Sequence, residues 1–216
     1  FVANGVTTVI WPQGFETDHS KAARTAEYYP EWVVAGDGRF DGYINAQFED
    51  QDVWHEHAFV VTPVPLVGDP VDTPCYAALT EGNPDDADRE MFCTNWSFYY
   101  DDLRQLFTGI QVAGPRLSVE TLDRGFHAIP HIESPDPSVP ACFYGPGDYT
   151  CVKDAAAMWW DRAATAPGAS TPGCWRVLED GLRHVAGAWP QHDLAAPRSP
   201  DDPCNGYASR TNFTLS

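Results

Sequence analysis

The residues with the most direct potential for chemistry lie in the segment Trp54-His-Glu-His57. Imidazole is the commonest protein ligand of transition metals, so His55 and His57, together with acidic neighbours, form a candidate metal site. In an extended segment both imidazoles would point to one side, with Glu56 on the other. A secreted metal-dependent hydrolase is therefore one functional hypothesis for the chain.

No established catalytic motif supports that hypothesis. The sequence has no Gly-x-Ser-x-Gly elbow, no phosphate-binding loop, no dinucleotide fingerprint and no His-Glu-x-x-His. Paired carboxylates such as Asp101-Asp102 are adjacent in sequence, and neighbours on a helix point in different directions. We therefore expect that the chain is not an enzyme and that it uses no cofactor.

A second group of candidate residues follows two short apolar segments. Ligands of open α/β sheets bind beyond the carboxyl ends of the strands. The candidates for ligand binding at such an edge are Trp11, Glu16, Asp18 and Asp37. Trp11 would supply an apolar or cation–π wall for the ligand. Glu16 or Asp18 would pair with a ligand ammonium group. Asp37 lies between two glycines, where a ligand can approach the backbone. In the alternative interpretation, Glu16 and Asp18 only cap the next helix and complement its dipole.

The elements that would position these residues form a βαβ unit. Residues 6–11 are rich in β-branched side chains and predict a buried strand. An Ala-rich helix over residues 19–28 ends before Pro30, and residues 31–35 predict the second strand. The connections are short enough for a right-handed parallel crossover, and residues 57–62 predict a third strand.

The rest of the chain predicts two helices and two late strands. Apolar residues recur at helical spacing from Tyr99 to Ile110, and Ser118 caps a further helix over residues 119–128. Residues 155–160 and 174–178 predict the late strands. The expected fold is therefore α/β, with a parallel sheet in a three-layer arrangement.

Six cysteines make an even set without a Cys-x-x-Cys pair, which favours disulfides over a zinc site. Six cysteines allow about 15 connectivities, and the short spacings favour sequence neighbours. The favoured pairs are Cys75–Cys93, Cys142–Cys151 and Cys174–Cys204. Disulfides persist only in oxidising compartments, so we expect a secreted or extracytoplasmic protein. The sequence has no basic-then-apolar leader, and we expect any signal peptide or anchor to have been removed or to lie upstream of Phe1.

The charge excludes one class of partner. Lys and Arg total 13 against 31 Asp and Glu, a formal net charge of -18. Such a chain is repelled by phosphate backbones and by anionic lipid headgroups, so nucleic acid is not an expected partner. The acidity either serves solubility or steers a cationic ligand, and the charge alone does not distinguish the two.

Several segments, in their order along the chain, resemble type I periplasmic solute-binding proteins, the branched-chain amino-acid receptor group of ABC importers. The matching segments are Asn4-Gly-Val-Thr-Thr-Val-Ile10, Tyr29-Pro-Glu-Trp-Val-Val34, Ala113-Gly-Pro115 between two helices, and Gly147-Asp-Tyr-Thr-Cys-Val-Lys-Asp154. The resemblance covers residues 1–190. It implies a partial α/β region over residues 1–190 and an extended C-terminal tail over residues 191–216.

The resemblance also implies a function. A receptor of this group binds an amino-acid-like or other small polar solute without catalysis and delivers it to an ABC transporter permease by closure of two lobes. Family members are about twice as long as this chain, which corresponds to their C-terminal portion. A third hypothesis is a structural or interaction fragment without its own ligand, in which the absence of a first lobe promotes self-association.

The cysteine analysis makes a direct prediction. If the three disulfides form, alkylation of the denatured but unreduced protein will label no thiol, and intact mass will rise only when reduction precedes alkylation. Six labelled thiols in the unreduced protein would contradict the extracytoplasmic assignment.

Overall fold

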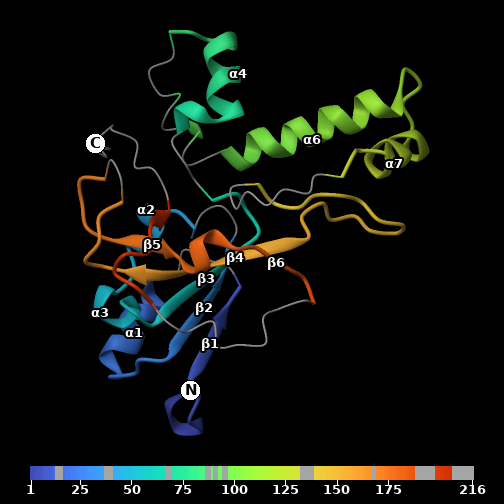
Figure 1. Cartoon of the computed structure of the whole chain (residues 1–216). Helices are drawn as coiled ribbons and strands as arrows, with labels where there is room; N and C mark the ends of the chain where they lie inside the picture. Colours follow the sequence, from blue (N-terminus) through green and yellow to red (C-terminus); the bar gives the residue numbers. More distant parts are fainter. Residues whose placement is uncertain are drawn as a thin grey trace.

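The fold is known from a computed structural model of the 216-residue chain. The residues it describes are 1–12, 17–36, 41–66, 70–85, 89, 92–93, 97–131, 139–166, 169–187 and 198–205. Within them a seven-stranded mixed sheet has the order β1-β2-β3-β4-β5-β7, with β6 paired to β4 (Figure 1). The strands are β1 (Thr8–Trp11), β2 (Glu31–Ala35), β3 (Ala58–Thr62), β4 (Asp154–Asp161), β5 (Cys174–Val177), β6 (His184–Val185) and β7 (Cys204–Asn205).

The predicted βαβ unit is confirmed. Strands β1 and β2 are parallel, with Val9 opposite Trp32, and α1 (Asp18–Thr25) connects them. Strand β3 continues the parallel arrangement, with Val34 opposite Val60. Alternate residues of β2 and β3 are buried, as the two-residue period of a strand requires.

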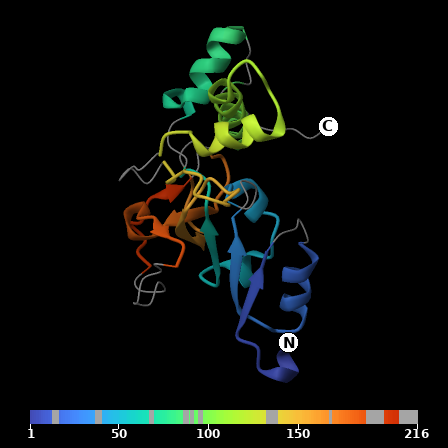
Figure 2. The same cartoon turned by 90° about the vertical axis from the view of Figure 1, so that its right-hand side faces the viewer.

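The expectation of a parallel sheet is confirmed only for β1, β2 and β3, because the sheet as a whole is mixed. Strands β4, β5, β6 and β7 all pair antiparallel with their neighbours. The reason lies in the connection between β3 and β4. A parallel return needs a crossover to the other end of the sheet, whereas here the chain leaves β3 at the carboxyl ends of the parallel strands, forms helices beyond those ends, and returns from the same side (Figures 1 and 2). A strand that enters from that side runs in the opposite direction.

The main core lies between the sheet and one layer of helices. Helices α1, α2 (Tyr43–Ala46) and α3 (Gln51–Trp54) contribute to it, with Trp160 and Trp175 stacked edge to face at 5.2 Å between ring centroids. On the opposite face, the buried cluster found within the described residues is a small one of Ala157, Trp159 and Leu178, with Phe59 packed against it. The expected three-layer arrangement is therefore not confirmed, because the longer helices do not cover this second face.

Among the described residues, helices also lie beyond the ends of the parallel strands (Figure 2). They are α4 (Pro74–Gly82), α6 (Ser97–Ala113) and α7 (Val119–His127), which we call the helical unit. A Cβ added at Gly125 would meet the carbonyl oxygen of Gly109 at 2.3 Å, so only glycine allows α7 to approach α6 this closely. As predicted, Ser118 caps α7, and its hydroxyl accepts a hydrogen bond from the backbone N–H of Thr121.

All three predicted disulfides are confirmed. Cys75–Cys93 joins α4 to the segment before α6, Cys142–Cys151 closes a short loop before β4, and Cys174–Cys204 joins β5 to β7. The last bond attaches residues 198–205, within the predicted C-terminal tail, to the edge of the sheet. No helix among the described residues is long and apolar enough to cross a membrane.

A buried ion pair joins the end of β3 to the start of β4. The Nε of Arg183 donates to Asp154 Oδ1 at 2.8 Å, and both side chains are less than a tenth exposed. The same guanidinium donates to the carbonyl oxygens of Pro63 and Val64 at 2.9 and 3.0 Å. Because Pro63 and Val64 follow β3 directly, Arg183 holds the point at which the chain leaves the sheet.

We expect Arg183→Leu to lower the free energy of unfolding by about 3–5 kcal/mol, because Asp154 is left buried without its cation. Urea unfolding of the oxidised protein measures this loss. Arg24→Leu, which breaks the exposed pair with Asp52, is the matched control and should cost far less stability, because solvent screens that pair. The double variant Arg183→Leu/Asp154→Leu should lose less stability than Arg183→Leu alone; an equal or greater loss would contradict the explanation.

Candidate functional site

The carboxyl ends of the three parallel strands lie at one edge of the sheet. The register places Trp11 opposite Val34 and Ala35 opposite Val61, so β1, β2 and β3 end at nearly the same level. This edge points toward the helical unit (Figures 1 and 2). We call it the carboxyl edge and define it by Trp11, Gly36, Thr62 and the first turn of α1.

Trp11 and Asp18, two of the predicted ligand-binding residues, both lie at the first turn of α1, Trp11 through its ring contact with His19. Trp11 ends β1, and its ring centroid lies 4.3 Å from that of His19, at 55° between the planes. Asp18 is exposed and is the first residue of α1. Thr17 is the N-cap, and its side chain makes no capping hydrogen bond. Asp18 is therefore placed to complement the dipole of α1 although it is not the N-cap, and its role in ligand binding stays a prediction.

The other two predicted residues, Glu16 and Asp37, lie outside the described part of the chain. Their roles as ligand-binding residues stay predictions. One described neighbour of each lies at or next to the carboxyl edge: Gly36 precedes Asp37, and Thr17, the N-cap of α1, follows Glu16.

Sequence analysis missed a buried carboxyl group at this edge. Asp41 is 5% exposed and accepts a hydrogen bond from the hydroxyl of Thr62, the last residue of β3. A Cβ on Gly36 would lie 2.6 Å from Asp41 Oδ1, so glycine at this position leaves room for the pair. The only signal in the sequence is a glycine directly after a strand, which is too common to identify a buried acid.

Glu49 is a second buried carboxyl group that the sequence did not reveal. It is 7% exposed and accepts a hydrogen bond from Ser20 Oγ at 2.6 Å, and Ser20 Oγ accepts one from the backbone N–H of Asp50 at 2.9 Å. Burial raises the pKa of Glu49 above its ordinary value, and the Ser20 hydrogen bond only partly opposes that shift. The pair connects the first turn of α1 to the segment that leads into α3.

The candidate metal ligands lie away from this edge. His55 and His57 precede β3, and Glu56 between them has a φ of 63°, so the segment is a turn rather than the expected extended chain. His55 Nδ1 lies 4.0 Å from Asp161 Oδ1, whereas the ring of His57 lies 6.3 Å from that of Tyr29. Within the described residues no three His, Cys, Asp or Glu side chains are grouped as metal ligands. The expectation that both imidazoles would share one face required an extended backbone, which this turn does not have.

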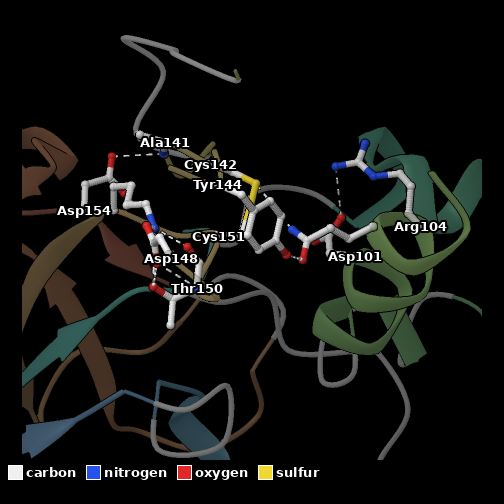
Figure 3. Close-up of a disulfide and its surroundings, with 11 residues drawn as sticks. Asp101, Arg104, Ala141, Cys142, Tyr144, Asp148, Thr150, Cys151 and Asp154 are labelled. Atoms are coloured by element: carbon white, nitrogen blue, oxygen red, sulfur yellow. Dashed lines mark hydrogen bonds and ion pairs between the residues drawn. A yellow bond between two sulfur atoms is a disulfide. The ribbon is translucent and has the colours of Figure 1, made fainter. Parts of the chain in front are cut away.

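A disulfide loop connects the sheet to the helical unit (Figure 3). The backbone N–H of Ala141 donates to Asp154 Oδ2 at 3.0 Å, at the start of β4. On the other side, the hydroxyl of Tyr144 donates to Gln105 Oε1 at 2.7 Å, in the middle of α6. The Cys142–Cys151 bond closes the loop between these two attachments. The loop therefore constrains how α6 is held relative to the carboxyl edge.

Comparison with known proteins identifies no relative: no protein-family model, curated protein or solved structure matches the chain. The likeness to type I solute-binding proteins therefore depends on the short segments of sequence quoted above. The α/β architecture and the three disulfides are compatible with that likeness but do not distinguish it from other α/β folds.

The burial of Glu49 predicts a pH-dependent stability. Because the folded pKa is raised, the folded state binds more protons than the unfolded state between the ordinary glutamate pKa and the folded pKa, so stability falls as pH rises through that window. Glu49→Gln keeps an acceptor for Ser20 and removes the buried charge. We expect the variant to be more stable than the parent protein at pH 7 and the difference to shrink toward pH 4, as measured by urea unfolding at both pH values.

Glu81→Gln, at an exposed position of α4, is the control and should show no such pH-dependent gain. If Glu49→Gln were equally destabilising at pH 7 and pH 4, the carboxylate would contribute to stability through its hydrogen bond and burial would not be the dominant cause.

Proposed function

We propose that this chain is part of an extracytoplasmic solute-binding protein of an ABC importer, and that it binds an amino-acid-like or other small polar solute at the carboxyl edge without catalysis. The observation that supports the proposal most is the convergence of three parallel strand ends, Trp11 and the first turn of α1 at one edge that points toward the helical unit. Ligands of open α/β sheets bind at such edges.

The chemistry of the edge suits a ligand with an ammonium group. The indole of Trp11 offers a partly exposed aromatic surface, and the exposed carboxylate of Asp18 follows on the first turn of α1. An aromatic face attracts a cation and the carboxylate neutralises it. The backbone N–H groups at the start of a helix favour an anion such as a ligand carboxylate. A zwitterion of the amino-acid type would use both features.

The position of the helical unit supports a mode of binding between two parts of the molecule. A solute at the carboxyl edge would lie at the end of the sheet beyond which α4, α6 and α7 are found (Figure 1). Two-part receptors of this kind bind a ligand by closing one part on the other. The closed form would then be the form that the permease recognises.

The disulfides support an extracytoplasmic location. All six cysteines are paired. Such bonds are stable in oxidising compartments, where solute receptors of importers operate.

A thermal-shift scan of the oxidised 216-residue chain against amino acids and small polar solutes tests the proposal. A solute at about 100 times its dissociation constant should stabilise the folded state by about 2.7 kcal/mol, which corresponds to a rise in melting temperature of about 5–10 °C for a chain of this size. Trp11→Ala and Asp18→Asn should abolish the shift, whereas Asp201→Asn, an exposed position outside the carboxyl edge, should keep it.

Two results would overturn the proposal. The first is the absence of any saturable shift across the panel with correctly oxidised protein. The second is a saturable shift that both Trp11→Ala and Asp18→Asn leave unchanged, because the ligand would then bind elsewhere on the molecule.

A further inference from the structure

One side of α6 carries a row of exposed apolar side chains. Leu103 is 52% exposed, Leu106 is 39% exposed and Phe107 is 64% exposed, and Tyr99 and the half-buried Ile110 continue the row at either end. We call these five residues the α6 stripe. Large apolar side chains gathered on one face of a helix are a mark of an interaction surface.

Helix α7 packs against a different side of α6. The contact between the two helices is made at Gly109, whose added Cβ would meet the ring of Phe126 at 2.9 Å, and at Ala113, which a Cβ on Gly125 would touch at 3.0 Å. At about 100° per residue, the direction from the α6 axis to Gly109 differs by about 100° from the direction to Ile110, whereas the direction to Ala113 differs by only about 20° from that to Leu106. The α6 stripe therefore borders the α7 contact at Leu106, which is still 39% exposed, and the other stripe residues lie farther round the helix.

The spacing of the stripe is that of a coiled-coil seam. Tyr99, Leu103, Leu106 and Ile110 are separated by 4, 3 and 4 residues, the alternation of the a and d positions of a heptad. Such a seam packs best against another helix with the same spacing. A second copy of this chain supplies one.

We infer that the α6 stripe is a self-association surface, on which α6 of a second copy of the chain packs antiparallel about a two-fold axis. In this register Leu103 faces Leu106 of the second copy, and Tyr99 faces its Ile110, so each a position meets a d position. The axis passes between residues 104 and 105, close to the middle of α6. The stripe is therefore self-complementary, as a two-fold interface requires.

The apolar area is sufficient for a weak but specific dimer. With about 150–250 Å² for an aromatic side chain, the exposed parts of the stripe amount to about 400–500 Å² per copy. A pair of copies then buries about 800–1,000 Å², at the lower limit for a specific interface, and we expect a dissociation constant of about 10–100 µM.

Charge sets the salt dependence of the dimer. The stripe itself contains no charged residue, whereas the whole chain carries a formal net charge of -18. Two copies repel one another over a distance that salt shortens, from about 30 Å at 0.01 M to about 3 Å at 1 M. The dimer is therefore favoured by added salt, opposite to an interface formed by ion pairs.

Sedimentation velocity of the oxidised chain, from about 1 to 200 µM and at low and high salt, measures the association. The dissociation constant of the dimer should fall as salt is added. Leu103→Lys and Leu106→Glu should each weaken dimerisation more than tenfold, because each variant places an unpaired charge in the seam twice. Val119→Glu on α7 is the control, since Val119 is 81% exposed but outside the stripe. Near-UV circular dichroism of each variant should match that of the parent, because all three positions are exposed.

Mixing the two stripe variants, Leu103→Lys and Leu106→Glu, tests the register. In an antiparallel pair the mixture places the introduced lysine of one copy against the introduced glutamate of the other and leaves one Leu103–Leu106 contact, so dimerisation should return. A parallel pair would place each charge against leucine and would stay monomeric. A parent chain that is monomeric at about 200 µM and high salt, or stripe variants that dimerise like the parent, would overturn the inference. Neither result depends on any ligand at the carboxyl edge.

Discussion

The pairing of β3 with β4 is the contact on which the rest of the structure depends. It joins residues far apart in the sequence, with Phe59 opposite Trp159 and Val61 opposite Ala157. Closing so long a loop costs conformational entropy, and burial of β4 on both faces offsets that cost. Once β4 is in place, β5, β6 and β7 can pair in turn. The helical unit is then held at the carboxyl edge by the two chain segments that connect it to β3 and β4.

Buried acids in the sheet are tolerated because each has a specific partner. Burial by itself would raise the pKa of Asp161, but the hydrogen bond from Arg176 at 2.6 Å and the backbone N–H groups of Ala163 and Ala164 lower it overall. Asp154 is likewise paired with Arg183. In a chain with 31 acidic and only 13 Lys and Arg residues, two of the few cations therefore lie beside buried carboxylates, where an unpaired charge would be costly.

The candidate site lies at the carboxyl edge of the sheet and the α6 stripe lies on the helical unit beyond that edge. The two surfaces differ in chemistry. The carboxyl edge combines an aromatic surface, an exposed carboxylate and buried hydrogen-bonded carboxyl groups around Asp41 and Glu49. The stripe is apolar throughout and lies beside the α7 contact on α6. We therefore propose a small polar solute for the first surface and another helix for the second. The Cys142–Cys151 loop contacts both β4 and α6, so it couples the positions of the two surfaces.

The sequence by itself determined the local elements and the cysteine pairs. Residues 31–35 form the predicted strand, Ser118 caps the predicted helix, and sequence-neighbouring cysteines are bonded, because each depends on residues close together in the chain. Only the tertiary structure decided the direction of β4, the turn at Glu56 and the burial of Asp41 and Glu49. These features depend on contacts between distant segments, whose geometry no local pattern of residues encodes.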